Sequence, residues 1–373
     1  MYRILVINPG STTTKVAYYE DETEIFRKEL EHSVSQLSRY KAIPDQIPMR
    51  REAIDTALTE KGIRPEKLDA FSAMCTGLLP MPGGVYEVNE KMYEHGLIGP
   101  GSRHPGNLGP LLAKDFADRY GGRAFVVDPS STDEFFDEAR LTGFPQIIRT
   151  SRGHPLNQRA VARQFSKDIG RAYEELNLIV VHMGGGISVA AHCRGKMIEC
   201  IDSTRGEGRM APTRSGAAPV ADIINMCFSG KYTRDEMLAM VMKTGGWTAH
   251  LGTSSAKEVA ERIDAGDQFA DLVFRTTAYQ IAKDIYTCAA CLCGHVNAIL
   301  FTGGIARSER FVALIKDRTD ALAPAYVYPG EYEMDALAHG AIRVLSGIEQ
   351  PRYYTGADID LSKFRNPDMI RPD

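Results

Sequence analysis

Two glycine-rich turns carry residue types that could do chemistry. The first turn spans Asn8–Lys15 (NPGSTTTK) and the second His182–Ser188 (HMGGGIS), and each follows a short apolar run. Such turns expose successive backbone N–H groups and hydroxyls with no Cβ in the way, as phosphate binding requires. A β-hairpin turn often needs glycine for its backbone conformation alone. Two similar turns in one chain nevertheless favour a polyphosphate held between them.

Neither turn matches the two common phosphate-binding motifs. The Gly-Lys pairs at 195–196 and 230–231 are followed by Met and Tyr rather than by Ser or Thr, so the sequence has no P-loop. The second turn lacks the G-x-G-x-x-G spacing, which makes a nicotinamide dinucleotide site a weak interpretation.

Polar residues near the turns are of the kinds that phosphoryl transfer uses. Asp128 ends an apolar strand, where its carboxylate could reach a Mg²⁺ ion, while His154 and Arg214 lie on small-residue loops. In phosphoryl transfer a cation neutralises the β and γ oxygens, and His or Arg donors bind the transferring group. Each residue alone also has a structural interpretation: a turn cap for Asp128, interior packing for His154 and His182, and an ion pair for Arg214.

The elements that must position these residues occur twice in the chain. Around the first turn we expect strands at Arg3–Ile7, Thr14–Tyr19 and Glu24–Glu31, and around the second at Leu178–His182, Ser188–His192 and Lys196–Asp202. Further strands at Asp69–Cys75 and Ala124–Asp128 in the first half correspond to Val296–Phe301 and Ala325–Tyr328 in the second. A unit repeated at this distance is a duplicated domain rather than a solenoid.

Length and composition agree with two folded domains. With about 150 residues per domain, the 373 residues predict two medium domains or one elaborate domain. We expect an N-terminal domain at 1–153, onto which 341–373 packs back, and a C-terminal domain at 154–340. The composition, 43% hydrophobic and 25% charged, excludes collagen-like, coiled-coil and disordered proteins. A net charge of -4 without a basic run argues against a nucleic-acid partner.

The cysteines and the apolar segments indicate a cytoplasmic protein without a membrane span. Seven cysteines form no regular framework, which favours a reducing compartment. The N-terminal apolar run is too short for a signal peptide, and glycines interrupt the best apolar stretch, Leu178–Ala191. Cys288, Cys291 and Cys293 with nearby His295 suggest a metal or redox site, but helical spacing favours core packing for the first two.

On these motifs the chain resembles the butyrate kinases of the acetate kinase family, whose superfamily also contains actin, sugar kinases and chaperone ATPases. The most specific segments are the two turns together with Thr213–Gly216 and Thr302–Ile305, while Pro82–Tyr86 and His104–Gly109 resemble butyrate more than acetate kinases. The resemblance implies an α/β fold of two ribonuclease-H-like (actin-like ATPase) domains. Each would be a mixed five-stranded sheet with helices, and the active site would lie in the inter-domain cleft. The C-terminal domain would carry the nucleotide site and the interface of a homo-oligomer, a dimer or a multiple of dimers.

The resemblance also implies a reaction: reversible in-line phosphoryl transfer between ATP and butyrate, or a related short or branched carboxylate, with Mg²⁺. The catalytic residues by similarity are His154, Arg214, Asp128 and Asn8. Nucleotide contacts would come from Ser11, Thr12, Lys15, His182, Gly184, Gly185, Gly186, Gly303, Gly304 and Ile305. The acid would lie near His104, Gly83 and Gly84. The metal would lie at Asp128, Asn8 and Glu333, with Glu331 and Asp335 as alternatives to Glu333.

One departure from the family pattern leaves the substrate open. Acetate kinases carry an Arg in the segment that corresponds to Gly77–Gly84, and here that segment has no basic residue, so Arg103 or Arg214 could bind the carboxylate. The acyl chain is also open among butyrate, isobutyrate and propionate, because one methylene discriminates only ~10 to 200-fold. An acetate or propionate kinase is therefore an alternative. A sugar kinase would need a general-base carboxylate, and a non-catalytic actin-like ATPase would leave His154 and Arg214 unexplained.

Overall fold

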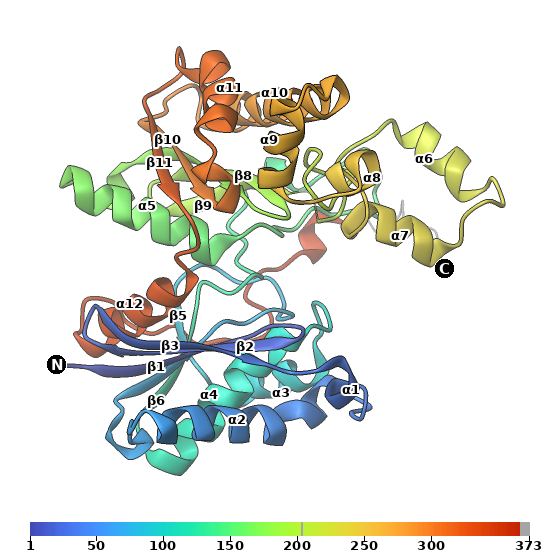
Figure 1. The fold of residues 1–373 in the computed structure, drawn as a ribbon. Helices are drawn as coiled ribbons and strands as arrows, with labels where there is room; N and C mark the ends of the chain where they lie inside the picture. The colour runs from blue at the N-terminus through green and yellow to red at the C-terminus, as the bar shows by residue number, and fades with distance from the viewer. Residues whose placement is uncertain (203, 366–373) are drawn as a thin grey trace. The chain divides into compact units, whose positions relative to one another are not determined.

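Two β-sheets of matching strand order organise the chain (Figure 1). The computed structural model describes residues 1–202 and 204–365. The chain divides into two units. The first contains Met1–Ser151, Pro155–Ala160 and the chain from Tyr332 onward, and the second contains Arg152–His154 and Val161–Glu331.

The sheet of the first unit has six strands in the order β3-β2-β1-β4-β6-β5. The strands are β1 (Arg3–Pro9), β2 (Thr13–Glu20), β3 (Thr23–Glu31), β4 (Ala70–Ala73), β5 (Val85–Glu87) and β6 (Arg123–Val127). β1, β2 and β3 are antiparallel neighbours, whereas β4 and β6 run parallel to β1. β5 pairs antiparallel with β6 and is one strand more than the five predicted.

Helices cover both faces of this sheet, which is why its central strand is apolar at every position from Ile4 to Ile7. Alternate residues of β1 point to opposite faces. Leu5 and Ile7 share a core with α2 (Ile47–Glu60) and α4 (Leu108–Tyr120), and Ile4 and Val6 share another with α12 (Glu333–Leu345). Figure 1 shows α2 and α4 on one side of the sheet and α12 on the other.

Shorter elements complete the first unit. They are α1 (Val34–Leu37), α3 (Glu90–Ile98), the 3-10 helices Ile43–Gln46, Pro65–Lys67, Pro105–Asn107, Asp137–Ala139 and Ser362–Phe364, and the first turns of α5 (Pro155–Ile169).

The sheet of the second unit has five strands in the order β11-β10-β7-β8-β9. They are β7 (Asn177–Met183), β8 (Ile187–Cys193), β9 (Lys196–Asp202), β10 (Ala298–Gly303) and β11 (Ala325–Pro329). Its helices are the rest of α5 from Val161 on, α6 (Val220–Cys227), α7 (Arg234–Met242), α8 (Trp247–Leu251), α9 (Ala256–Asp264), α10 (Gln268–Cys291) and α11 (Glu309–Thr319), with 3-10 turns at Tyr173–Glu175 and Gly304–Arg307. Trp247, Phe274 and Phe311 pack together in its core, with ring centroids 4.7 to 6.1 Å apart.

The two sheets confirm the duplicated fold predicted from the sequence. Strands β3-β2-β1-β4-β6 and β9-β8-β7-β10-β11 have the same order and the same directions. The unit boundaries differ somewhat from the expected ones, because the first unit also takes 155–160 and 332–340. The reason is the apolar face of α12, whose Leu337 and Ala341 pack against the first sheet.

The three cysteines near the end of α10 differ in burial. Cys288 is fully buried in the second core, Cys291 is partly buried and Cys293 is exposed. Within residues 1–202 and 204–365, no three His, Cys, Asp or Glu side chains are grouped so as to hold a metal ion. No helix in the described part of the chain has the length and apolar character to cross a membrane.

Candidate active site

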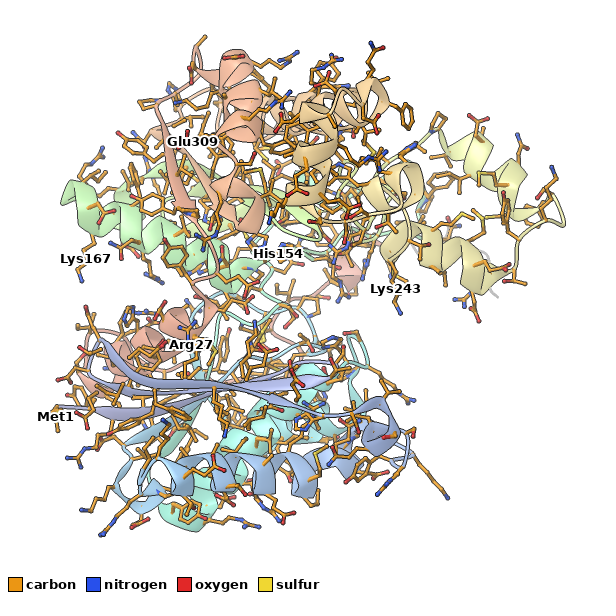
Figure 2. The ribbon with its side chains drawn as sticks, viewed as in Figure 1. Met1, Arg27, His154, Lys167, Lys243 and Glu309 are labelled. Carbon is orange, nitrogen blue, oxygen red and sulfur yellow. The ribbon has the colours of Figure 1, made fainter. Side chains whose placement is uncertain are left out.

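The two histidines of the second unit meet on one face of its sheet. His182 in β7 is paired in register with Ser188 in β8, so both side chains lie on the same face. His154 directly precedes α5 (Figure 2) and stacks on His182, with ring centroids 4.1 Å apart and the planes inclined by 17°. The His154 Nδ1 atom lies 2.8 Å from Ser188 Oγ. Tertiary structure therefore joins two predicted site residues into one pair.

Burial keeps both imidazoles neutral. It holds the pKa of His154 well below the ordinary value, and the charges of His182 and Arg214 act in the same direction. Burial lowers the pKa of His182 to about 4, against an opposing effect of Glu331. At neutral pH each ring can thus donate a hydrogen bond without carrying a charge.

Arg214 lies against the second glycine turn. The guanidinium fills the space that a Cβ on Gly186 would occupy. Arg214 Nη1 donates to Thr204 Oγ1 at 2.9 Å and lies 3.6 Å from Asp202 Oδ1. The preceding residue, Thr213, donates through both its backbone N–H and its hydroxyl to the carbonyl of Gly185, at 3.1 and 2.8 Å. Two hydrogen bonds therefore tie the loop that carries Arg214 to the second glycine turn.

The glycines after β10 have different structural roles. Gly303 has a φ of +90° and lies where a Cβ would run into the backbone of Met183, so no other residue fits without a shift. A Cβ on Gly304 would meet nothing within 4 Å, which leaves its Cα open to a ligand. The Ile305 side chain is buried in the core of the second unit, which leaves its backbone as the part that the predicted nucleotide contact would use.

In the first unit, Asn8 and Lys15 are paired across β1 and β2 and lie on the face that α12 covers. Asn8 Nδ2 donates to Glu333 Oε2 at 3.0 Å. The two alternatives to Glu333 lie elsewhere: Asp335 accepts from the Tyr19 hydroxyl at 2.7 Å, and Glu331 belongs to the second unit, beside His182. Of the three carboxylates that the sequence left open, Glu333 is the one in contact with Asn8.

A buried arginine that sequence reasoning missed supports the first turn, whose Ser11 and Thr12 are exposed. Arg50 of α2 is fully buried and donates to the Thr13 carbonyl and to Thr14 Oγ1, both at 2.8 Å. Burial lowers the pKa of Arg50 to about 10, which leaves it charged at neutral pH.

The repeat relates two hydroxyl side chains that directly follow the two glycine turns. Thr14 and Ser188 follow their glycine turns at equivalent positions of the two copies. Each lies 2.8 Å from a histidine nitrogen, Thr14 from His32 and Ser188 from His154. The repeat therefore places a hydroxyl at the same position in both copies, and the structure pairs each one with a histidine.

Asp128 directly follows β6 and is buried with a φ of +37°, a conformation that few residues other than glycine adopt. Its Oδ1 accepts the Gly84 N–H at 2.8 Å. Gly83 and Gly84 are buried, and a Cβ on either would meet an arginine side chain, Arg159 or Arg352. These glycines therefore make room for guanidinium groups, whereas the sequence had placed them at the acyl pocket.

Around His104, Arg103 lines a cavity in the first unit. His104 caps a 3-10 turn, with its Nδ1 accepting the Gly106 N–H at 3.0 Å, and burial together with the charge of Arg50 lowers its pKa. The cavity has a volume of about 390 Å³ and is lined by Lys41, Ala42, Ile43, Pro44, Gly96, Leu97, Ile98, Arg103 and Asn107. Two cations, Lys41 and Arg103, beside apolar neighbours suit a small carboxylic acid.

The predicted metal residues suit Mg²⁺ chemically. Asn8, Asp128 and Glu333 offer amide and carboxylate oxygens, the hard donors that this ion prefers. Mg²⁺ usually keeps several waters and is shared with substrate phosphates, so one or two protein carboxylates are enough. The residues present therefore fit a metal ion that arrives with a nucleotide.

Comparisons with known proteins match nearly the whole chain. The model of the acetokinase family matches residues 146–322. A protein of Clostridium botulinum (strain Eklund 17B / Type B) named "Probable butyrate kinase" is 44% identical over 353 residues, 95% of this chain and 99% of the relative. Butyrate kinase 2 of Clostridium acetobutylicum is 43% identical with the same coverage. The crystal structure of Porphyromonas gingivalis acetate kinase shares the fold, with a TM-score of 0.78 at 17% identity over 92% of this chain and 100% of that one.

Proposed function

The chain belongs to the acetokinase family, and on this premise we propose that it transfers the γ-phosphoryl group of ATP reversibly to butyrate or a related short-chain carboxylate. The products are an acyl phosphate and ADP. One observation carries the proposal: His154, His182 and Arg214 are gathered at the glycine turn of the second unit, two neutral donors and one cation. This is the set that stabilises a transferring phosphoryl group.

In the proposed reaction a carboxylate oxygen attacks the γ-phosphorus in line. The new O–P bond forms as the bond from that phosphorus to the β–γ bridging oxygen breaks, and ADP leaves with the electron pair. His154 and Arg214 donate to the equatorial oxygens of the transferring group. A carboxylate is already a nucleophile, so no general base is required.

The remaining residues bind the nucleotide and its metal. His182 and the backbone of Gly184–Gly186 contact the phosphates, together with Ser11, Thr12 and Lys15 of the first turn, and Gly303 and Gly304 line the adenosine pocket. Mg²⁺ would neutralise the β and γ oxygens when bound. Asn8, Asp128 and Glu333 would hold it.

We place the acid beside His104, with Arg103 or Arg214 as the residue that binds its carboxylate. Arg103 lines the cavity of about 390 Å³ beside Ile43, Leu97 and Ile98, which supports it as the first choice. Arg214 is the second choice, because its guanidinium already packs against Gly186 of the second glycine turn.

An acyl-phosphate assay tests the function. The purified protein is incubated with MgATP, hydroxylamine and straight or branched acids of two to five carbons, and the acyl hydroxamate is measured. We expect product with butyrate or a close neighbour, and none with glycerol or glucose in a parallel ADP-release assay. ADP release with a polyol but no hydroxamate with any acid would instead indicate a sugar kinase.

We also propose that the protein is cytoplasmic and forms a homo-oligomer through the second unit. All seven cysteines are free, as in a reducing compartment. Exposed apolar side chains gather on and after α6, among them Val220, Ile224 and Phe228. Sedimentation equilibrium measures the assembly, and a monomer at micromolar concentration would contradict it.

A further inference from the structure

Arg159 holds two buried carboxylates of the first unit at once. It lies on α5, five residues after His154 in the sequence, and only 5% of its side chain is exposed. Its Nε lies 2.8 Å from Asp128 Oδ1, and its Nη1 donates to Glu134 Oε2 at 2.9 Å. The two carboxylates are 4% and 8% exposed, so this guanidinium compensates negative charge that is largely shielded from water.

The same carboxylates hold the Gly83–Gly84 backbone. Glu134 Oε1 accepts the Gly83 N–H at 3.0 Å, and Asp128 Oδ1 accepts the Gly84 N–H at 2.8 Å. A Cβ on Gly83 would lie 2.6 Å from Arg159 Cζ, so the glycine is needed for the guanidinium to reach its place. Arg159, Asp128, Glu134, Gly83 and Gly84 therefore form a closed ring, which we call the Arg159 ring.

The Arg159 ring determines how Asp128 presents its carboxylate. The Asp128 backbone has a φ of +37° and is tied to the Gly84 carbonyl through an N–H···O bond of 2.9 Å. Gly84 and Arg159 both contact Oδ1, which leaves Oδ2 as the oxygen that can turn toward a metal ion. Partners of this kind orient a carboxylate ligand, and their loss typically costs 10–100-fold in metal affinity or activity.

We propose that Arg159 is a positioning residue of the phosphoryl-transfer site, which sets the orientation of Asp128 toward the Mg²⁺ of the nucleotide complex. The proposal rests on the proposed function, because that function gives Asp128 its place at the metal. Arg159 itself touches neither substrate nor metal. It acts through Asp128, and through Glu134 it keeps the Gly83–Gly84 segment in register with the same carboxylate.

The experiment compares the full-length wild type with Arg159→Met, Arg159→Lys and a matched control, Arg140→Met. Arg140 forms an equally buried ion pair with Asp133, at 4% and 0% exposure and two distances of 2.9 Å, and has no contact with Asp128 among the described residues. Removing either arginine leaves a buried carboxylate without this cationic partner. The control therefore removes an equally buried cation that makes no contact with Asp128, Glu134, Gly83 or Gly84 in the part of the chain that the structure describes.

Two quantities are measured. The first is the Mg²⁺ concentration for half-maximal acyl hydroxamate formation, with kcat and the KM for butyrate. The second needs no turnover: the rise in melting temperature produced by ADP with Mg²⁺ compared with ADP alone. For Arg159→Met we expect the Mg²⁺ requirement to rise ~10–100-fold, kcat to fall, the KM for butyrate to stay nearly constant and the Mg²⁺-dependent melting shift to shrink.

The Mg²⁺ requirements of the variants decide whether the proposal for Arg159 stands. A Mg²⁺ requirement within twofold of wild type for Arg159→Met, or the same increase for Arg140→Met, overturns it. If Arg159→Met does not fold, Arg159→Lys is decisive, because a single ammonium cannot reproduce the fork that joins two carboxylates. Lysine should then raise the requirement at least threefold, and no increase overturns the proposal. A wild type that makes no acyl hydroxamate refutes the proposed function alone, and the melting shift still tests Arg159.

Discussion

Replacing Gly186 by alanine should displace the arginine of the reaction without unfolding the protein. A Cβ at this position would collide with the guanidinium of Arg214, specifically with its Nη1, Cζ and Nε atoms. The backbone at Gly186 has no positive φ, so alanine is acceptable in conformation. The collision involves the far end of a flexible side chain, and the arginine can therefore move away.

The magnitudes separate an effect on activity from one on stability. Moving Arg214 breaks its 2.9 Å hydrogen bond to Thr204, worth about 1 kcal/mol of folding free energy. The same movement takes a cation away from the transferring phosphoryl group, where arginines contribute ~10³–10⁵ in kcat. A displacement of about 1 Å already costs ~10²-fold, which is about 2.7 kcal/mol of activation free energy. We therefore expect kcat to fall at least ~10²-fold, toward the value of Arg214→Ala.

The assay is hydroxamate formation at saturating ATP and butyrate, with urea unfolding on the same samples. Gly185→Ala is the neighbouring comparison, because its Cβ would lie 3.8 Å from Thr213 Oγ1 and meet nothing else. Its effect should be limited to the KM for ATP. Gly143→Ala, with no atom within 4 Å of the new Cβ, controls for the substitution itself. If kcat of Gly186→Ala stays within threefold of wild type, Arg214 does not act at the phosphoryl group as we reason.

Three further predictions follow from the geometry. Glu333→Gln should lower kcat ~10–100-fold and raise the Mg²⁺ requirement, because Glu333 contacts Asn8. Asp335→Asn should do neither, because Asp335 contacts Tyr19 instead. Equal effects of the two variants in steady-state kinetics would contradict the assignment of Glu333 to the metal. His32 and His182 have folded pKa values of about 4 and ordinary unfolded values near 6.5, so the unfolded chain binds more protons as the pH falls through this window. The free energy of unfolding should be at its full value above pH 6.5 and should decrease below pH 6.5 by up to about 1.4 kcal/mol per pH unit for each histidine. A melting temperature that does not change from pH 7 to pH 5 would refute this prediction. Arg50→Met removes the hydrogen bonds from this guanidinium to the Thr13 carbonyl and to Thr14 Oγ1. Because hydrogen bonds from a charged donor contribute about 1.5–3 kcal/mol each, we expect a loss of stability in calorimetry and a higher KM for ATP. An unchanged KM would remove Arg50 from the support of the first glycine turn.

Local patterns were enough to predict the strands and their duplication. Strand periodicity and turn glycines act within about ten residues, so Arg3–Pro9, Thr13–Glu20 and Lys196–Asp202 agree with the predicted strands to within two residues at each end. β5 escaped prediction because Val85–Glu87 is three residues long and is defined by its pairing with β6, far along the chain.

The candidate site likewise has parts that the sequence indicated and parts that required the tertiary structure. Residue types and turn spacing were enough to name His154, His182, Arg214, Asn8 and Asp128 as candidates, and the structure brings the first three together at the second glycine turn. Only the tertiary structure distinguishes Glu333 from Asp335 and Glu331, because Glu333 alone of the three accepts a hydrogen bond from Asn8, 325 residues away in the sequence. We therefore propose Glu333 as the metal-site carboxylate.

The buried arginines were beyond the reach of the sequence. Arg50 and Arg159 lie in helices where a charged residue normally points to water, and nothing nearby in sequence marks them as internal. Their partners, Thr13 and Thr14 for one and Asp128 and Glu134 for the other, come from loops and strands that only folding brings close. A charge can be buried only where partners for it converge, and that convergence is a property of the tertiary structure. The sequence by itself determined the two copies and their glycine turns, whereas tertiary packing decided which side chains hold those turns in place.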